Sequence, residues 1–398
     1  MLAISVVGVL LMACAPKQEP LSQRMVRSEI ARCPEATYLD GREGTLKWNY
    51  TTGLELQAML EMADQVGHDA SYRHSRLDRE SLIDYVDAWY DAIIDETGAI
   101  QGGYKKEKYN LDHVCPARTL LTLRKFRPKA KYDAAVDSIF AQLQSQPRTE
   151  AGAFWHKQVY PYQVWLDGLY MAEPFYAEYA AETGRKELFD DIAQQFKVAW
   201  EKTFDPATGL PRHAWNESRD MFWCDPETGQ SAHSWGRATG WYAMALVEVL
   251  DFFPQDHPER HALLDILQQL LSTLPRYADP KTKMWYQVLD APGREGNYVE
   301  ATCSAMFTYV YLKSARKGWL PKGTGIDPAT LYKRLVEAFI RVNEDGTLSL
   351  VDCCAVAGLG GKENRSGTYD YYIHETITTN DPKGIGPFIW ASLEYERI

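Results

Sequence analysis

Apolar residues recur at helical spacing along nearly the whole chain, whereas the alternation typical of strands is scarce. Segment 131–147 carries Tyr132 and Ile139 on a single apolar stripe. Asp133 falls on the opposite side, so this helix is expected to face solvent along one flank. Segment 239–253 is apolar nearly all round, which is typical of a helix buried on every side. The pattern predicts helices at about 22–33, 53–66, 80–96, 112–126, 131–147, 164–183, 186–202, 239–253, 258–275, 298–317, 327–342 and 385–397.

The two kinds of helix alternate along the chain, and this alternation predicts the architecture. Fully buried helices suit an inner ring, and one-sided helices suit an outer ring around it. We therefore expect an all-α (α/α)6 barrel, a six-hairpin toroid, over residues 23–398. A helical solenoid of similar hairpins would need a strict sequence repeat, and we find none. In the toroid, the loops before the inner helices meet at one end, so functional residues are expected there.

Two aspartates stand at or near the starts of predicted inner helices. Asp112 precedes one of them, and Asp167 belongs to the sequence WLDG at the start of another. Such an aspartate often does no more than cap its helix. Asp167, however, is predicted to lie a few residues inside an aromatic helix, where a carboxyl group is expected to be paired or to hold its proton. A protonated carboxyl group beside a second carboxylate, Asp112, suits general acid–base catalysis.

Basic and aromatic side chains precede the same helices. The net charge of −11, without basic runs, argues against nucleic acid or an anionic membrane surface as a partner. An anionic substrate would therefore need local cations or hydrogen-bond donors, and the candidates are His156, Lys157, His213 and Arg237. Arg237 is the best candidate for a uronate carboxylate, because a guanidinium group binds a carboxylate with two hydrogen bonds. The indoles expected to stack on sugar rings are Trp165, Trp215 and Trp235.

The N-terminus has the pattern of a bacterial lipoprotein signal. Its apolar run, residues 2–13, is too short to span a bilayer and ends directly before Cys14. A small residue before a cysteine resembles a lipobox, in which the segment before the cysteine is removed and the thiol takes a lipid. We expect 1–13 to be the signal peptide, Cys14 the lipid attachment site and 14–22 a tether. The protein would then be exported, periplasmic or anchored to the outer membrane, and would contact a membrane only through its lipid; an ordinary cleaved signal or a buried N-terminal strand is the alternative.

Short motifs follow one another along the chain in a specific order. They are WNY at 48–50, LDH at 111–113, HK at 156–157, WLDGLYM at 165–171, DPETG at 225–229, WGR at 235–237, GWYAMA at 240–245 and NDPKGIG at 380–386. Each motif alone is a weak signal, but their order and spacing together are specific. Over nearly the whole predicted mature chain, they resemble the unsaturated rhamnogalacturonyl hydrolases, glycoside hydrolase family 105.

The resemblance implies an (α/α)6 barrel that removes a terminal 4,5-unsaturated uronic acid from the non-reducing end of lyase-generated oligosaccharides. It implies that an aspartic acid protonates C4, that water adds at C5, and that the resulting hemiketal opens and releases the remaining sugar. No metal or nucleotide cofactor is implied. Asp167 matches the general acid/base and Asp112 the acid beside it. The residues expected to bind substrate, from the resemblance or from their loops, are Tyr50, His156, Lys157, Trp165, His213, Trp235 and Arg237.

Three other activities fit the same barrel. They are a conventional inverting glycosidase, a uronate polysaccharide lyase with His156 or Lys157 as base, and a glycan-binding lipoprotein without turnover. The sequence leaves open which sugar follows the uronate, and whether the uronate derives from glucuronate or galacturonate. We expect a monomer. The six cysteines after Cys14 have no spacing typical of a metal site, so no metal is expected.

Overall fold

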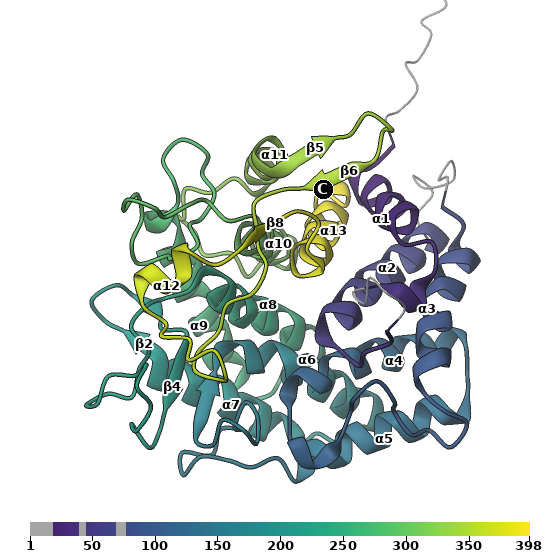
Figure 1. Cartoon of the computed structure of the whole chain (residues 1–398), viewed down its shortest axis with the longest axis horizontal. Coiled ribbons are helices and arrows are strands. Elements are labelled where there is room, and N and C mark those ends of the chain that lie inside the picture. The colour runs from purple at the N-terminus through teal and green to yellow at the C-terminus, as the bar shows by residue number, and fades with distance from the viewer. Residues whose placement is uncertain (1–18, 40–44, 69–76) are drawn as a thin grey trace, which may run out of the picture.

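The computed structural model describes residues 19–39, 45–68 and 77–398 (Figure 1). The predicted signal peptide, Cys14 and most of the predicted tether lie outside the described residues. The described chain is mainly helical. Its α-helices are α1 (Leu21–Arg32), α2 (Tyr50–His68), α3 (Arg79–Ile93), α4 (Cys115–Phe126), α5 (Ala130–Gln144), α6 (Leu166–Thr183), α7 (Leu188–Thr203), α8 (Gly236–Phe252), α9 (Arg260–Thr273), α10 (Ala301–Lys317), α11 (Pro328–Phe339), α12 (Tyr369–Ile373) and α13 (Pro382–Glu396).

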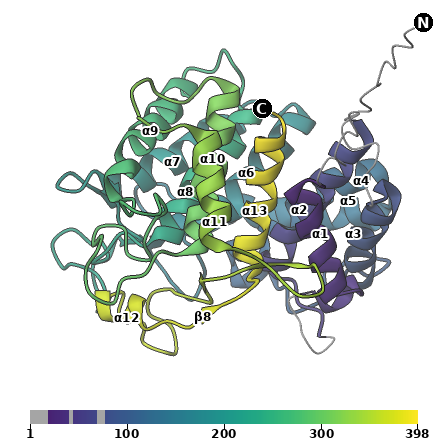
Figure 2. The same ribbon diagram turned by 90° about the horizontal axis from the view of Figure 1, so that it is seen from above.

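Six helices form a closed inner ring, because each packs against the next and the last packs against the first. Their order around the ring is α2, α4, α6, α8, α10 and α13. Each of α1, α3, α5, α7, α9 and α11 packs on the outside of an inner helix. Figure 2 shows the inner helices α10 and α13 side by side, with the outer helix α1 beyond α13. The predicted (α/α)6 barrel is confirmed.

Burial follows the two kinds of helix that the sequence pattern distinguishes. Helix α8 is buried from Gly236 to Leu250. Helix α7 buries Phe189 and Phe196 but exposes Asp190, so only one of its flanks faces the protein. Because an amphipathic stripe has only one apolar face to bury, such a helix belongs on the outside.

Glycines allow the inner helices to approach one another closely. A Cβ atom on Gly53 of α2 would lie only 2.6 Å from Cα of Pro116 in α4. A Cβ atom on Gly240 of α8 would lie 2.6 Å from Sδ of Met306 in α10. Two of the ring's helix–helix contacts therefore depend on the absence of a side chain.

The loops before the inner helices carry short antiparallel strand pairs. β1 (Gln163–Trp165) pairs with β4 (Ala214–Asn216), and β7 (Cys353–Cys354) pairs with β8 (Ile377–Thr378). The other pairs are β2 (Phe204–Asp205) with β3 (Leu210–Pro211), and β5 (Ile340–Val342) with β6 (Leu348–Leu350). We call the end of the barrel that holds the first turns of the inner helices the rim, and the opposite end the base.

Toward the base, buried ion pairs join three inner helices: Arg118 comes from the first turn of α4, and Glu248 and Lys313 come from the second halves of α8 and α10. Glu248 of α8 binds Arg118 of α4 at 2.5 Å and Lys313 of α10 at 2.8 Å. Burial acts to raise the pKa of Glu248, but Lys313 and Arg118 hold it well below its usual range. Ser22 at the start of α1 donates to the Glu396 carboxylate at the end of α13, so α1 begins at the base. Among the described residues, no helix has the length and apolar character required to cross a membrane.

All of the predicted helices are present, and the differences lie at their ends and in the loops. The structure adds the short α12 within 343–384, which the periodicity left as an interruption. Helix α6 begins at Leu166, because β1 occupies the three preceding residues. Asp167 is therefore in the first turn of α6, and the prediction that it lies a few residues inside the helix is wrong. Asp112 lies in a separate 3-10 turn, Leu111–His113, ahead of α4.

Candidate active site

The first turns of the inner helices bring chemically active side chains together at the rim. Tyr50, the first residue of α2, interacts electrostatically with Asp112, Asp167, Arg237 and Asp381, which come from four other inner-helix starts. The inner helices run parallel, so all of their N-termini face this region. Each N-terminus contributes the equivalent of about half a positive charge. The rim is therefore a favourable place for an anion in an otherwise acidic protein.

Asp167 is held beside His213. The backbone N–H of Leu166 donates to the His213 carbonyl at 3.1 Å, which places the imidazole next to the first turn of α6. Nε2 of His213 lies 3.3 Å from Oδ2 of Asp167, an ion-pair distance. The imidazole is fully buried, whereas the Asp167 side chain is 15% exposed. Asp167 therefore combines a buried polar neighbour with access from solvent.

Asp112 has a different set of neighbours. The backbone N–H of Leu111 donates to the His156 carbonyl at 3.1 Å and so joins the 3-10 turn to the loop before α6. Nζ of Lys157 lies 2.5 Å from one carboxylate oxygen of Asp112, and Nε2 of His156 lies 3.6 Å from the other. Burial acts to raise the pKa of Asp112, but Lys157 and His156 outweigh it and lower the pKa. Asp112 is therefore ionised at neutral pH.

His156 lies between the two aspartates as a neutral ring. Burial lowers its pKa to about 4, although Asp112 acts in the opposite direction. Its ring stacks on Trp165, with centroids 4.8 Å apart and planes at 13°. A Cβ atom on Gly168 would lie 3.1 Å from Nδ1 of His156, so the glycine of the WLDG motif leaves room for the imidazole.

Arg237 occupies in α8 the position that Asp167 occupies in α6, the second residue of the helix. It is 1% exposed and donates to the Cys354 carbonyl. Its guanidinium lies 4.7 Å from the centroid of Trp235. In the described part of the chain it forms no ion pair with a carboxylate. Burial acts to lower the pKa of Arg237, but Cys354 and Asp381 raise it, so the group stays charged.

The predicted stacking indoles differ in their surroundings. Trp165 is 6% exposed and stacks on both His156 and Tyr160. Trp235 is 1% exposed and packs against His213, so the structure places it behind the imidazole rather than at the surface. In the β1–β4 ladder, Trp215 pairs with Val164, whereas Trp165 pairs with the residue before Trp215. Because strand side chains alternate, Trp215 faces the opposite side of the ladder.

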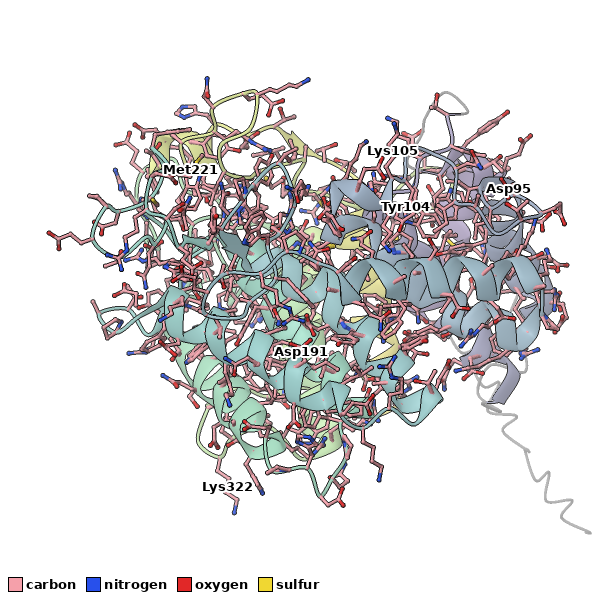
Figure 3. The ribbon with its side chains drawn as sticks, turned by 90° about the horizontal axis from the view of Figure 1, so that it is seen from below. Asp95, Tyr104, Lys105, Asp191, Met221 and Lys322 are labelled. Carbon is pink, nitrogen blue, oxygen red and sulfur yellow. The ribbon has the colours of Figure 1, made fainter. Side chains whose placement is uncertain are left out.

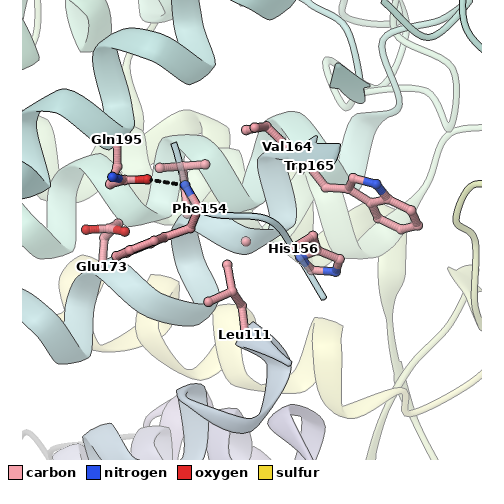
Figure 4. Close-up of a pocket in the computed structure, with 9 residues that line it drawn as sticks. Leu111, Phe154, His156, Val164, Trp165, Glu173 and Gln195 are labelled. Atoms are coloured by element: carbon pink, nitrogen blue, oxygen red, sulfur yellow. Dashed lines mark hydrogen bonds between the residues drawn. The ribbon is translucent and has the colours of Figure 1, made fainter. Parts of the chain in front are cut away.

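A small cavity lies beside the site, between the two layers of helices (Figure 4). Its walls include Leu111, His156, Gly168, Glu173 and Gln195. Its volume of about 10 Å³ is room for at most one water molecule and none for a sugar. Substrate must therefore approach from the exposed side of the aspartates.

The structure also adds a residue that the sequence did not indicate. Tyr372 of α12 is fully buried, and its hydroxyl lies 2.7 Å from Nδ1 of His213. The only sequence signal is the tyrosine-rich segment YDYY at 369–372, in an interval without helical periodicity. Within the described ranges, no group of three or more His, Cys, Asp or Glu side chains has the arrangement of a metal site.

These contacts define what the site can do. One carboxyl group, Asp112, is ionised beside a lysine, and the other, Asp167, lies at ion-pair distance from an imidazole. Two carboxyl groups in such different environments are suited to separate roles in acid–base catalysis. The neighbouring Arg237 adds a buried positive charge for an anionic group of the substrate.

Comparison with known proteins agrees with this geometry. The family model described as Glycosyl Hydrolase Family 88 matches residues 21–398. A family 105 glycoside hydrolase structure from C. acetobutylicum ATCC 824 superposes with a TM-score of 0.88 at 40% identity, covering 96% of this chain and 100% of that one.

Two further relatives are more distant. The unsaturated rhamnogalacturonyl hydrolase YesR of Bacillus subtilis (strain 168) is 27% identical over 269 residues, 65% of this chain and 70% of that protein. A possible family 105 member from Salmonella enterica has a TM-score of 0.74 at 21% identity, covering 100% of this chain and 99% of that one, which shows the fold alone. The chain therefore belongs to glycosyl hydrolase family 88 and is a structural relative of a family 105 glycoside hydrolase.

Proposed function

We propose that this enzyme removes a terminal 4,5-unsaturated uronic acid from pectin-type oligosaccharides that polysaccharide lyases produce. The observation that carries the proposal is the buried, charged Arg237 beside two carboxyl groups of different character. A buried cation that forms no ion pair with a carboxylate in the described chain is suited to bind an anion from elsewhere. The carboxylate of a uronic acid has the charge and planar shape that a guanidinium group binds best.

The proposed reaction is hydration of the C4=C5 double bond. Asp167 donates its proton to C4, and the positive charge that develops at C5 is shared with the ring oxygen. Water adds at C5 and gives up a proton to a carboxylate of the site. The product is a hemiketal, whose ring opens and releases the remaining sugar. Asp112, held ionised by Lys157, supplies negative charge beside the developing cation.

The other activities considered for this barrel fit the contacts less well. A lyase would need a free base at C5, but Lys157 is paired with Asp112, and His156 is buried with its Nε2 facing the same carboxylate. A conventional inverting glycosidase would act at the glycosidic bond through an acid and a base on opposite faces of the sugar. A binding protein without turnover would have no need for two carboxyl groups in opposed environments.

Substitution of Asp167 tests the reaction directly. With an unsaturated disaccharide, we expect Asp167→Asn to lower kcat by about 10²–10⁴-fold, because it removes the proton donor. The measurement is the ultraviolet absorbance of the conjugated double bond, which hydration removes. Asp370→Asn, at an exposed position on α12, is the matched control and should retain full activity. A gain in absorbance from a saturated substrate would identify a lyase, and near-normal hydrolysis by Asp167→Asn would refute the proposal.

Substitution of Arg237 tests recognition of the carboxylate. We expect Arg237→Gln to raise KM about 10- to 100-fold, the cost of losing a charged hydrogen bond. Substrate whose carboxylate is methylated should bind equally poorly to the wild type and to the variant. Arg219→Gln, at an exposed position in the loop after β4, is the control. A variant that discriminates against the methyl ester as strongly as the wild type does would exclude this role for Arg237.

The ion pair of Asp112 predicts a pH effect. The pKa of Asp112 lies below its usual range, so the carboxylate form that the reaction requires is lost only when the pH falls through that low value. Lys157→Met removes the largest interaction that opposes burial and should raise the pKa of Asp112. The acidic limb of the profile of kcat/KM against pH should then move up by about 1–3 pH units. Lys105→Met, at an exposed position near the rim (Figure 3), should leave the profile unchanged.

We also propose that the protein is exported and carries a lipid on Cys14. In support, α1 begins at the base, where Ser22 binds Glu396. Figure 3 shows the rim residue Met221 and Lys322, which follows α10, at opposite ends of the molecule. An anchor that precedes α1 would therefore leave the rim accessible. In the native host, Cys14→Ser should move the protein from the membrane fraction to the soluble fraction, as measured by immunoblotting; an unchanged distribution would contradict lipid attachment.

A further inference from the structure

His213 lies between the carboxyl group of Asp167 and the hydroxyl group of Tyr372, which come from distant parts of the chain. One imidazole nitrogen, Nε2, faces Oδ2 of Asp167 at 3.3 Å. The other, Nδ1, lies 2.7 Å from the Tyr372 hydroxyl. His213 and Tyr372 are both fully buried, so water does not compete for this contact. The three side chains form a continuous line from α12 to α6.

The phenol of Tyr372 determines which nitrogen of His213 carries the hydrogen. Its hydroxyl proton needs an acceptor, and Nδ1 is the acceptor that the described residues place within hydrogen-bond distance. Burial raises the pKa of Tyr372 well above its usual value, so the phenol keeps its proton. If Nδ1 carried the hydrogen instead, the buried phenol proton would lack an acceptor, which is costly. An imidazole with a single hydrogen therefore carries it on Nε2, the nitrogen that lies 3.3 Å from Oδ2 of Asp167.

The surroundings of Tyr372 fix its position. Its ring stacks on Trp235, with centroids 5.9 Å apart and planes at 20°. Its backbone carbonyl accepts a hydrogen bond from the side-chain amide of Gln287 at 3.2 Å. Its ring and its backbone are thus both held in place, as expected for a residue that orients a catalytic neighbour.

We propose that Tyr372 is a positioning residue for the proposed reaction: it fixes the Nε2–H tautomer of His213, which then donates a hydrogen bond to Asp167 once Asp167 has given up its proton. The step creates a carboxylate in a largely buried place. In the structure Nε2 lies 3.3 Å from that oxygen without a hydrogen bond. A small turn of the newly formed carboxylate would bring its charge onto an N–H donor that is already in place. In the opposite tautomer, a lone pair would face the carboxylate and would destabilise it.

The first test measures the tautomer without substrate, so it does not depend on the proposed function. In protein labelled with ¹⁵N-histidine, the nine imidazoles are resolved by their nitrogen shifts, and His213 is assigned from its absence in His213→Gln. We expect hydrogen on Nε2 and none on Nδ1 in the wild type at neutral pH. Hydrogen on Nδ1 would overturn the proposal even if the enzyme hydrates its substrate as proposed.

The second test uses two neighbouring tyrosines. Tyr372→Phe removes only the hydroxyl, and we expect kcat to fall about 10- to 100-fold with KM within about twofold, since the lost interaction acts on the charged form of Asp167. The His213 spectrum of this variant should show a mixture of tautomers. Tyr371→Phe is the matched control, because its hydroxyl accepts a hydrogen bond from the Gly358 backbone, away from His213. It should change neither kcat nor the spectrum.

The outcomes are distinct. Unchanged kcat in Tyr372→Phe, or an equal loss in both variants, would overturn the proposal, because a structural role would not separate them. If Tyr372→Phe does not fold, the His213 tautomer measured in the wild-type protein decides whether the proposal holds. Failure of the proposed function would appear separately, as near-normal activity of Asp167→Asn.

Discussion

The rest of the structure depends on closure of the inner ring. Six parallel helices can close only if neighbours approach closely, and Gly53 against Pro116 and Gly240 against Met306 show how the chain permits this. Closure places every inner N-terminus on the same rim. The aligned peptide dipoles then favour an anion there, although the protein as a whole carries a net charge of −11. A binding site for a charged sugar is thus a consequence of the architecture.

Short backbone contacts convert this general arrangement into a specific site. Hydrogen bonds from Leu111 to His156 and from Leu166 to His213 join the turns that carry Asp112 and Asp167 to the loops that carry their histidine neighbours. The Gly236 N–H continues the series by donating to the Gln287 carbonyl. These bonds are local to the rim and largely independent of side-chain identity. The loops can therefore carry varied side chains while the positions of the two aspartates stay fixed.

Buried charges toward the base and at the rim differ in whether they have ion-pair partners. Toward the base, Glu248 forms buried ion pairs with Arg118 and Lys313, so each of these charges has a partner of opposite sign. At the rim, Arg237 has no such partner among the described residues, and Oδ2 of Asp167 makes no hydrogen bond. Buried charges without ion-pair partners cost stability, so Arg237 marks a place where an anionic ligand would complete the structure.

The sequence by itself determined the helices and their inner or outer place, and it predicted the aspartates and cations of the candidate site. Periodicity records how much of each helix is buried, and Asp112, Asp167 and Arg237 stand next to helix starts that this pattern reveals. Sequence motifs also indicated the family. Local patterns carry no information on contacts between distant segments, so helix ends shifted where β1 formed, and α12 was missed.

Only the tertiary structure decided which side chains contact one another at the site. In the structure, Trp235 is buried behind His213, and Trp215 faces the opposite side of the β1–β4 ladder from Trp165. Asp112 forms an ion pair with Lys157. The tertiary structure also brought Tyr372 to His213 across 159 residues of chain, a contact for which neither segment carries a local signal. The physical reason is that helical spacing specifies a surface to be buried, whereas the neighbour that buries it is chosen by closure of the whole ring.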